Sequence, residues 1–133
     1  MNPDILIVED EPAILTSLEF ILDHAGWTTQ SVTDGEAAIK AMQSTMPKMV
    51  VLDLMLPKIS GFEVLKILRN SAATKNLPIM ILTAKGQQQD KRTAQELGAS
   101  SFVTKPYANT DVVAAVQSLI GKAQPKPTDK SGE

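Results

Sequence analysis

Cysteine is absent from this sequence, and so are long apolar runs and any excess of basic residues. Without cysteine the chain can form no disulfide, no thiolate metal site and no cysteine nucleophile, which suits a reducing compartment. No apolar run approaches the roughly 20 residues that a membrane-spanning helix needs, and the opening MNPDILIVED lacks the basic start of a secretory signal. The formal net charge of −2 and the pI near 5.4 argue against nucleic acid or anionic membranes as partners. We therefore predict a soluble, cytoplasmic protein.

What the chain does have is the length and apolar content of one globular domain. Its 133 residues are 43% hydrophobic, enough for a single buried core and too few for two full domains. The end of the chain, GKAQPKPTDKSGE, has two prolines, three lysines and no bulky apolar residue. We expect a domain over residues 1–121 and a disordered tail, or the remnant of a linker, over residues 122–133.

Short apolar or β-branched runs alternate with segments of helical periodicity. DILIV, MVVLD and PIMIL are apolar almost throughout, as strands buried on both faces of a parallel sheet are, while WTTQSV and SSFVT are weaker strands. Apolar stripes predict helices with one core face. One stripe is formed by Ile14, Leu15, Leu18, Ile21, Leu22 and Ala25, and another by Val112, Val113, Val116, Leu119 and Ile120.

Capping residues indicate where the helices begin and end. Pro12 fits a first helical turn, Asp34 is expected to cap the start of the next helix, and Gly26 and Gly98 follow helix ends. The order is then a strand and a helix repeated five times, which predicts an α/β fold with a doubly wound parallel sheet. In such sheets ligands bind beyond the carboxyl ends of the strands.

Charged and hydroxyl residues follow four of the predicted strands. They are Glu9-Asp10-Glu11, Asp53, Thr83-Ala84 and Lys105-Pro106. Because parallel strands end at one edge of the sheet, we expect these groups to converge there, and crowded carboxylates favour a hard divalent cation, typically Mg²⁺. Lys105 and Thr83 supply the positive charge and the hydroxyl that suit a phosphoryl oxygen. Asp53 can then act as a nucleophile that forms an acyl phosphate.

The stretches ILIVEDE, VVLDLMLPKISGFEVL, PIMILTAKG and GASSFVTKPY resemble the receiver domain of two-component response regulators, in particular chemotaxis-regulator-like receivers. The resemblance extends from Asp4 to Ile120. It implies a flavodoxin-like (βα)5 fold with strand order 2-1-3-4-5. It also implies a signalling protein, and no enzyme, that accepts a phosphoryl group from a sensor histidine kinase or a histidine phosphotransfer protein and then changes its surface.

The resemblance assigns the acceptor and the metal ligands to particular residues. Asp53 is the implied phosphoacceptor. Asp10 and Asp53 are implied to coordinate Mg²⁺ directly, the backbone carbonyl of Met55 is a further ligand, and Glu9 acts through water.

The resemblance also implies how the phosphoryl group is held and sensed. Lys105 is implied to hold one phosphoryl oxygen, and Thr83 with the amide of Ala84 holds another. The peptide bond between Lys105 and Pro106 is implied to be cis. Phe102 stands at the position of the family's switch aromatic, which turns inward when Thr83 is drawn toward the phosphoryl group.

Purely structural roles are an alternative for several of these residues. Asp53 could cap the turn after its strand, and Glu11 is expected to favour the positive end of the helix that follows it. Phe102 is most simply a core residue, which is compatible with a switch. We interpret His24 as a surface or interface residue and Trp27 as partly buried packing.

The segment QQQDKRTAQEL offers only Ala94 and Leu97 as apolar anchors, so we expect the loosest helix there. In receivers this helix forms the output face together with the fifth strand and the fifth helix. Ser100-Ser101 and the arginine-free TDVVAAVQSLI lack the charge pairs that join many DNA-binding regulators. We therefore expect a monomer that presents residues 85–102 to a downstream protein.

Three other functions fit parts of the pattern. A haloacid-dehalogenase-type phosphohydrolase also uses a strand-end Asp and Mg²⁺, but it needs a second acid two residues later, where this chain has Met55. A receiver fragment of a multidomain transcriptional regulator is a further alternative, although nothing after Gly121 could itself form a DNA-binding domain. A flavodoxin-like or nucleotide-binding module would need a glycine-rich phosphate loop after the first strand, which the sequence lacks.

Overall fold

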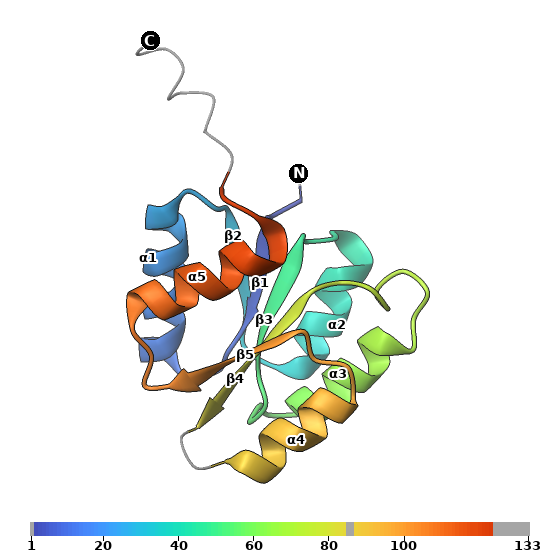
Figure 1. The fold of residues 1–133 in the computed structure, drawn as a ribbon. Coiled ribbons are helices and arrows are strands. Elements are labelled where there is room, and N and C mark those ends of the chain that lie inside the picture. Colours follow the sequence, from blue (N-terminus) through green and yellow to red (C-terminus); the bar gives the residue numbers. More distant parts are fainter. Residues whose placement is uncertain (1, 85–86, 124–133) are drawn as a thin grey trace.

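Strands and helices alternate along the whole of the described chain, as the sequence predicts. The structure is a computed structural model that describes residues 2–84 and 87–123. Its elements are β1 (Ile5–Val8), α1 (Pro12–Ala25), β2 (Thr29–Val32), α2 (Gly35–Ser44), β3 (Met49–Asp53), α3 (Gly61–Arg69), β4 (Ile79–Ala84), α4 (Gln88–Glu96), β5 (Ser101–Lys105) and α5 (Asn109–Ile120) (Figure 1).

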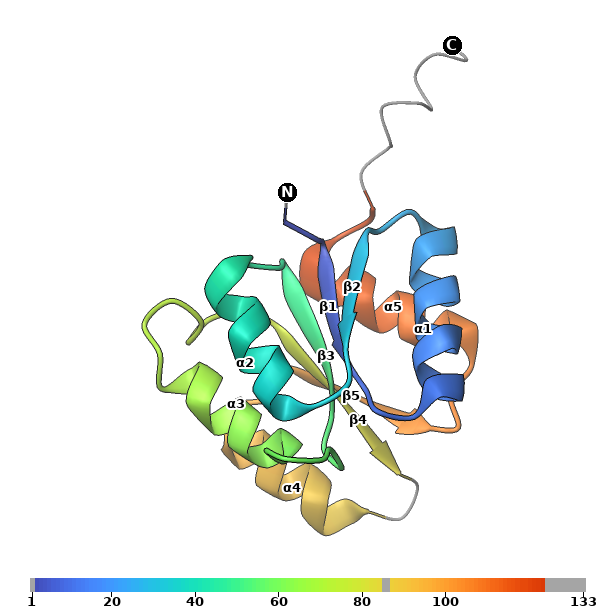
Figure 2. The ribbon, with the colours of Figure 1, turned by 180° about the vertical axis from the view of Figure 1, so that it is seen from behind.

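The strands form one parallel sheet in the order β2-β1-β3-β4-β5. Helices α1 and α5 cover one face of this sheet, and α2, α3 and α4 cover the other (Figures 1 and 2). The predicted doubly wound, flavodoxin-like fold and its strand order are therefore confirmed. Because every strand runs in the same direction, all five carboxyl ends lie at one edge.

Each face of the sheet has its own apolar core, because the three apolar strands bury side chains on both sides. Ile5 and Val51 face the side of α1 and α5, whereas Leu6 and Val50 face the side of α2 and α3, and all four are at most 1% exposed. These central strands are therefore fixed from both sides, and so are the residues at their carboxyl ends.

The predicted capping residues stand at the helix ends. Pro12 is in the first turn of α1, and Gly26 after its end has a φ of 107°. The Asp34 side chain accepts a hydrogen bond of 2.7 Å from the amide of Ala37 at the start of α2. These local signals mark the start of α1, the end of α1 and the start of α2.

Strand β2 starts later than predicted, and Trp27 differs from its expected role. The Trp27 amide donates to the Leu22 carbonyl (3.1 Å), so this residue still belongs to the end of α1. Its side chain is 2% exposed in the core under α1 and α5, where partial burial was expected. His24 is exposed and stacks on Phe20, with 5.8 Å between the ring centroids.

Among the helices of the described chain, α4 has the fewest buried residues, as predicted. Ala94 alone is buried, and Leu97 just beyond the helix is half-buried.

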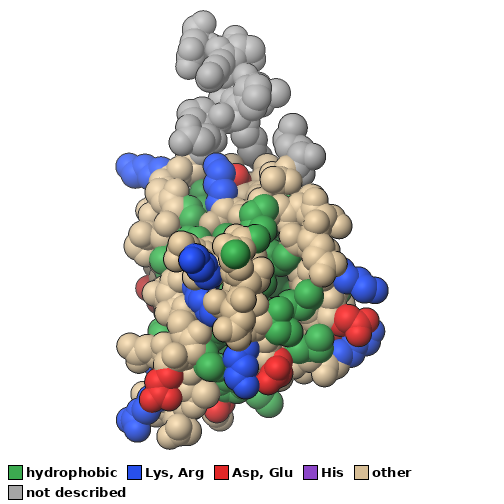
Figure 3. All heavy atoms as spheres, turned by 90° about the vertical axis from the view of Figure 1, so that its right-hand side faces the viewer, with side chains coloured by type: hydrophobic (Ala, Val, Ile, Leu, Met, Phe, Trp, Pro, Cys, Tyr) green, Lys and Arg blue, Asp and Glu red, His purple; other side chains and the backbone are tan. Residues whose placement is uncertain are grey.

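On the side of the molecule that Figure 3 shows, acidic and basic side chains are interspersed, with no patch of one sign. Among the described residues, no helix has both the length and the apolar character to cross a membrane. The predicted tail lies, from residue 124 onward, outside the described residues.

Candidate functional site

A pocket of about 270 Å³ opens at the carboxyl edge of the sheet. It brings together residues from the ends of four segments that are far apart in the sequence. Its lining consists of Asp10, Glu11, Asp53, Leu54, Met55, Leu82, Thr83, Ala84, Gln87, Asp90 and Lys105. The predicted acceptor, acidic and phosphate-holding residues thus meet in one place, with Glu9 beneath them and Phe102 outside the lining.

Asp53 is the last residue of β3, and its side chain is almost fully buried at this edge. One carboxylate oxygen accepts a hydrogen bond from the Met55 amide (3.1 Å), and the other lies 3.2 Å from the ammonium group of Lys105. Gly61 packs directly behind, since a Cβ at this position would overlap the Asp53 carbonyl oxygen. The Gly61 amide also donates to the Leu54 carbonyl (3.0 Å). The start of α3 therefore holds the loop that follows Asp53.

Lys105 ends β5 and joins two carboxylates. Its ammonium group lies 3.2 Å from Asp53 and 3.4 Å from Glu9. Burial by itself would lower the pKa of Lys105, but the negative charges of Asp53 and Glu9 outweigh that effect and the pKa is raised. Lys105 is thus held as a cation that faces the Asp53 carboxylate.

Glu9 is completely buried, which its sequence did not indicate. One of its oxygens accepts a hydrogen bond from the Glu11 amide (3.1 Å). The other has no hydrogen-bond partner among the described residues, and Lys105 approaches it only at ion-pair distance. Burial, with the adjacent Asp53 adding to it, raises the pKa of Glu9 to about 7. A buried oxygen held only by an ion pair is costly, and a further positive charge at this point would stabilise it.

The carboxylates of Glu9, Asp10 and Asp53 can each direct one oxygen to a common point. These three oxygens lie within 4.8 Å of one another. An all-oxygen set of anionic donors is the set that hard cations such as Mg²⁺ prefer. A divalent cation would also satisfy the partnerless oxygen of Glu9 and offset the cost of burying its charge, which is the main cause of its raised pKa. The residues therefore fit the cation that the sequence pattern predicts.

The residues predicted to hold and sense the phosphoryl group belong to β4, β5 and the residue after β5. Thr83 is 4% exposed near the end of β4, and Ala84 after it is exposed. The peptide bond between Lys105 and Pro106 is cis. Phe102 is half-buried in β5 and lies under the ammonium group of Lys91, 5.4 Å from the ring centroid.

Sequence reasoning missed two polar residues of this pocket. Gln87 and Asp90, at the beginning of α4, both line it. Nothing in their pattern distinguishes them from other polar residues on an exposed helix, because their position depends on where β4 delivers the chain. Helix α4 therefore begins at the wall of the pocket.

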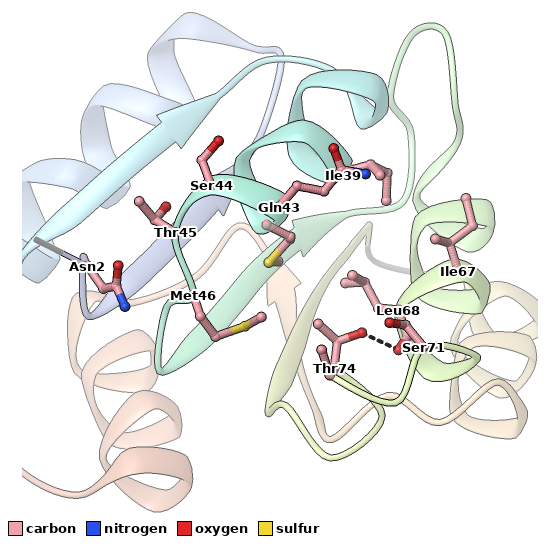
Figure 4. A pocket seen from close by; sticks show the side chains of 12 residues that line it. Asn2, Ile39, Gln43, Ser44, Thr45, Met46, Ile67, Leu68, Ser71 and Thr74 are labelled. Atoms are coloured by element: carbon pink, nitrogen blue, oxygen red, sulfur yellow. Dashed lines mark hydrogen bonds between the residues drawn. The ribbon is translucent and has the colours of Figure 1, made fainter.

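A larger hollow of about 610 Å³ lies away from this chemistry, between the ends of α2 and α3 (Figure 4). Its lining includes Asn2, Met42, Thr45, Leu68 and Thr74, and none of its lining residues is charged. Its lining has no carboxylate or imidazole group that could bind a metal ion or activate a hydroxyl group. The pocket at the carboxyl edge is therefore the candidate site.

The doubly wound sheet and the Asp-centred acidic pocket at its carboxyl edge define a phosphoacceptor class of domain. The model of the response regulator receiver domain matches residues 5–117. This chain belongs to the response regulator receiver family.

Curated relatives are transcriptional regulators. The alkaline phosphatase synthesis transcriptional regulatory protein PhoP of Bacillus subtilis is 40% identical over 124 residues, which are 93% of this chain and 51% of that protein. The DNA-binding dual master transcriptional regulator RpaA of Synechocystis is 37% identical over 125 residues, 94% of this chain and 52% of that protein. The chain thus spans about half the length of these relatives.

Solved receiver structures share the fold. A putative response regulator from Chloroflexus aurantiacus is 30% identical, with a TM-score of 0.87 over 92% of this chain and 100% of that one. The receiver domain of the sensor histidine kinase PA1611 from Pseudomonas aeruginosa is 26% identical, with a TM-score of 0.83 over 92% of this chain and 100% of that one, and has a magnesium ion coordinated in its active-site cleft.

Proposed function

We propose that Asp53 accepts a phosphoryl group from a phosphohistidine of a sensor kinase or a histidine phosphotransfer protein in the cytoplasm. The observation that carries this proposal is the position of the Asp53 carboxylate. It is buried at the end of a central strand, and one oxygen is held by an amide while the other lies 3.2 Å from Lys105. A carboxylate fixed in this way is a nucleophile with a defined direction of attack.

The transfer exchanges one bond to phosphorus for another. An Asp53 oxygen forms the new P–O bond as the P–N bond to the donor imidazole breaks, and the imidazole keeps the electron pair of that bond and takes a proton. Lys105 is already placed as a cation beside Asp53, and Thr83 lies in the same pocket with its hydroxyl group. Their roles are to hold the oxygens of the phosphoryl group while its charge is redistributed.

We assign Glu9, Asp10, Asp53 and the Met55 carbonyl to Mg²⁺, with Glu9 acting through water. A bound Mg²⁺ supplies positive charge that offsets the charge of the carboxylates and the incoming phosphoryl group. The support is the cluster of three carboxylates and the partnerless oxygen of Glu9. The magnesium in the receiver domain of PA1611 supports the same assignment.

The proposed output surface consists of α4, β5 and α5, with Thr83 and Phe102 as the switch residues. Phe102 lines a hollow of about 400 Å³ on this surface, together with Asp111 and Ala115. We propose that a downstream protein binds there and that the domain itself stays monomeric. Residues 85 and 86 of the proposed responsive segment lie outside the described residues.

Incubation with Mg²⁺ and acetyl phosphate, read by intact mass, tests the acceptor. The parent protein should gain one adduct of about 80 Da, the mass of one phosphoryl group on an acyl phosphate. Asp53→Asn should remove the adduct, because the amide is not a nucleophile. Lys105→Ala should keep the adduct but lose the response of the output surface.

The matched control is Asp90→Asn, which makes the same chemical change to another carboxylate of the same pocket. This variant should be labelled like the parent. Labelling of Asp53→Asn at the parent's stoichiometry would refute the acceptor assignment. Rapid turnover of many phosphate esters by the parent would instead indicate a phosphohydrolase.

A further inference from the structure

The two ends of α4 are held in different ways. Its C-terminal end is followed by Gly98 and Ser100, both of which accept hydrogen bonds from Arg69 at the end of α3. Its N-terminal end begins at Gln87, which provides no side-chain cap, and lines the acceptor pocket. The end of the helix that is near the site is therefore the less restrained end.

Arg69 makes three hydrogen bonds, each from a different nitrogen. Nε donates to the Gly98 carbonyl (2.9 Å), Nη1 to the Thr74 carbonyl (3.0 Å) and Nη2 to the Ser100 hydroxyl (3.3 Å). None of the ion pairs among the described residues includes Arg69. The guanidinium charge is thus directed entirely at neutral oxygens, one of which follows the negative end of the α4 dipole.

Thr74, whose carbonyl accepts one of these hydrogen bonds, is itself held in place by several others. Thr74 is 4% exposed, and its hydroxyl donates to the Leu68 carbonyl (Figure 4). Its amide donates to Ser71 (3.1 Å), and its carbonyl also accepts from the Leu77 amide (3.0 Å). Arg69 therefore joins α4 to a loop that is already closed on α3.

The segment after α4 is shaped to receive the Arg69 side chain. Gly98 has a φ of 104°, and a Cβ at this position would lie only 3.1 Å from Cγ and Nε of Arg69. Ser100 is tied to β4, because its amide donates to the Ile79 carbonyl (2.8 Å) and its hydroxyl accepts from the Ile79 amide (3.0 Å). Arg69, Gly98 and Ser100 thus form one fixed junction, which we name the Arg69 junction.

We propose that Arg69 is a positioning residue whose junction serves as the pivot of α4, so that phosphorylation of Asp53 moves the N-terminal end of this helix while its C-terminal end stays in place. The inference rests on the proposed phosphorylation of Asp53. A helix of nine residues is about 13 Å long, so a tilt of about 10° about one end moves the other by about 2 Å. Displacements of this size are typical of switching helices.

The contacts made by the middle of α4 determine what a tilt of this helix would change. Ala94 is the one buried residue of α4, and Lys91, one turn before it, covers Phe102. A tilt about the Arg69 junction therefore lifts Lys91 from Phe102 without breaking the attachment at Gly98. The pivot converts an event at the pocket into a change at the proposed switch aromatic.

Hydrogen exchange with and without beryllium fluoride, which stands in for the phosphoryl group, tests the pivot in four proteins: the parent, Arg69→Met, Arg69→Lys and Lys66→Met. Methionine keeps an apolar stem and removes all donors. Lys66→Met is the matched control, because Lys66 is on the same helix and contacts only the exposed Glu63. In the parent, beryllium fluoride should change exchange over residues 87–91 and leave residues 95–100 unchanged.

Arg69→Met should speed exchange of residues 95–100 by about tenfold without beryllium fluoride, because charge-assisted hydrogen bonds are lost. Beryllium fluoride should then alter both ends of α4. Arg69→Lys, which keeps one donor group, should restore part of the parental pattern, and Lys66→Met should match the parent. Labelling by acetyl phosphate should stay within about twofold of the parent in all four proteins, since Arg69 does not contact the pocket.

A response confined to residues 87–91 in Arg69→Met, as in the parent, would overturn the pivot. The pivot would also be overturned if Arg69→Met exchanged faster along the whole of α4 while beryllium fluoride still changed only residues 87–91. That result would show that Arg69 only stabilises the structure. If Arg69→Met fails to fold, Ser100→Ala removes one acceptor of the junction and should give the same shift with a smaller amplitude. If the parent itself neither labels nor responds to beryllium fluoride, the proposed function fails, whereas fast exchange of residues 95–100 in Arg69→Met would still report the junction.

Discussion

Helices α3 and α4 are both nine residues long, and α3 begins behind Asp53 while α4 begins at the pocket, yet they are attached to the domain very differently. Helix α3 buries Gly61, Val64, Leu65 and Leu68, whereas α4 buries only Ala94. Burial of apolar surface is the main source of docking energy. We therefore interpret α3 and the loop before it as a fixed wall behind Asp53, and the weakly docked α4 as a movable wall of the pocket.

The difference extends to the first turn of each helix. The Ser60 hydroxyl accepts a hydrogen bond from the Glu63 amide (3.3 Å) at the start of α3. Gln87 at the start of α4 gives no such bond. The end of α4 nearest the acceptor therefore has neither a buried anchor nor a cap, which makes it the part of the site that opens at the lowest cost.

The largest expected effect comes from removing one anchor from each helix. Leu65→Ala should lower the free energy of unfolding by about 2–5 kcal/mol, because Leu65 is completely buried. Leu97→Ala, which truncates the half-buried residue just after α4, should cost about 1 kcal/mol or less. Urea unfolding of both variants measures the difference. Equal losses would show that α4 is docked as firmly as α3.

Mg²⁺ should strengthen the fixed wall and leave the movable one unchanged. Its proposed side-chain ligands lie just after β1 and at the end of β3, so exchange should slow over residues 54–61, with little change in α4. At a hundredfold excess over the dissociation constant, the stabilisation should be about 2.7 kcal/mol. Thermal unfolding with and without Mg²⁺ checks the total.

Asp10→Asn should greatly weaken this stabilisation, and Asp23→Asn is the control, because Asp23 is an exposed carboxylate on α1 outside the acidic cluster. A melting temperature of the parent that is indifferent to Mg²⁺ would contradict the metal assignment. Slower exchange throughout α4 would contradict the separation of the two walls.

Without Mg²⁺, the buried Glu9 should make the domain less stable as the pH rises. Burial raises the pKa of Glu9 from 4.5 to about 7, so the folded state binds this proton more tightly than the unfolded state does. The resulting stability is complete below pH 4.5 and is lost as the pH rises to about 7. The loss should be on the order of 3 kcal/mol.

Glu9→Gln isolates this effect, because other carboxylates titrate over part of the same range. The difference in unfolding free energy between parent and variant, measured in EDTA from pH 4 to 8, should change with the sign given above. A difference independent of pH would show that Glu9 has the same pKa in the folded and the unfolded state.

Much of the fold followed from local signals. Pro12 and Asp34 mark helix starts in the sequence and stand there in the structure, and the apolar strands that the sequence predicts are the central ones. The late start of β2 was not predictable in the same way. It depends on the Trp27 amide completing the end of α1, a contact that competes with strand pairing.

The chemical residues of the site were predictable as a set, because parallel strands bring their carboxyl ends together. Their environment was not. The complete burial of Glu9 depends on packing from several segments, and the place of Asp90 in the pocket depends on the path of the chain into α4. Arg69 gives no sequence signal, since an arginine at the end of a helix ordinarily faces solvent.

The smallest expected effect concerns the missing cap of α4. Ser60→Ala should cost about 1 kcal/mol at α3, whereas Gln87→Ala should cost almost nothing because no bond is lost. Gln87→Ser should raise the free energy of unfolding by only about 0.5 kcal/mol, since the backbone at Gln87, with φ −93° and ψ 57°, must first become extended as it is at Ser60.

In Gln87→Ser, exchange over residues 88–91 should slow, and its response to beryllium fluoride should shrink, because a capped helix start resists displacement. Gln88→Ser, one residue too late to cap, is the control. An undiminished response in a Gln87→Ser variant whose helix start is protected would show that the missing cap plays no part in the mobility of this wall.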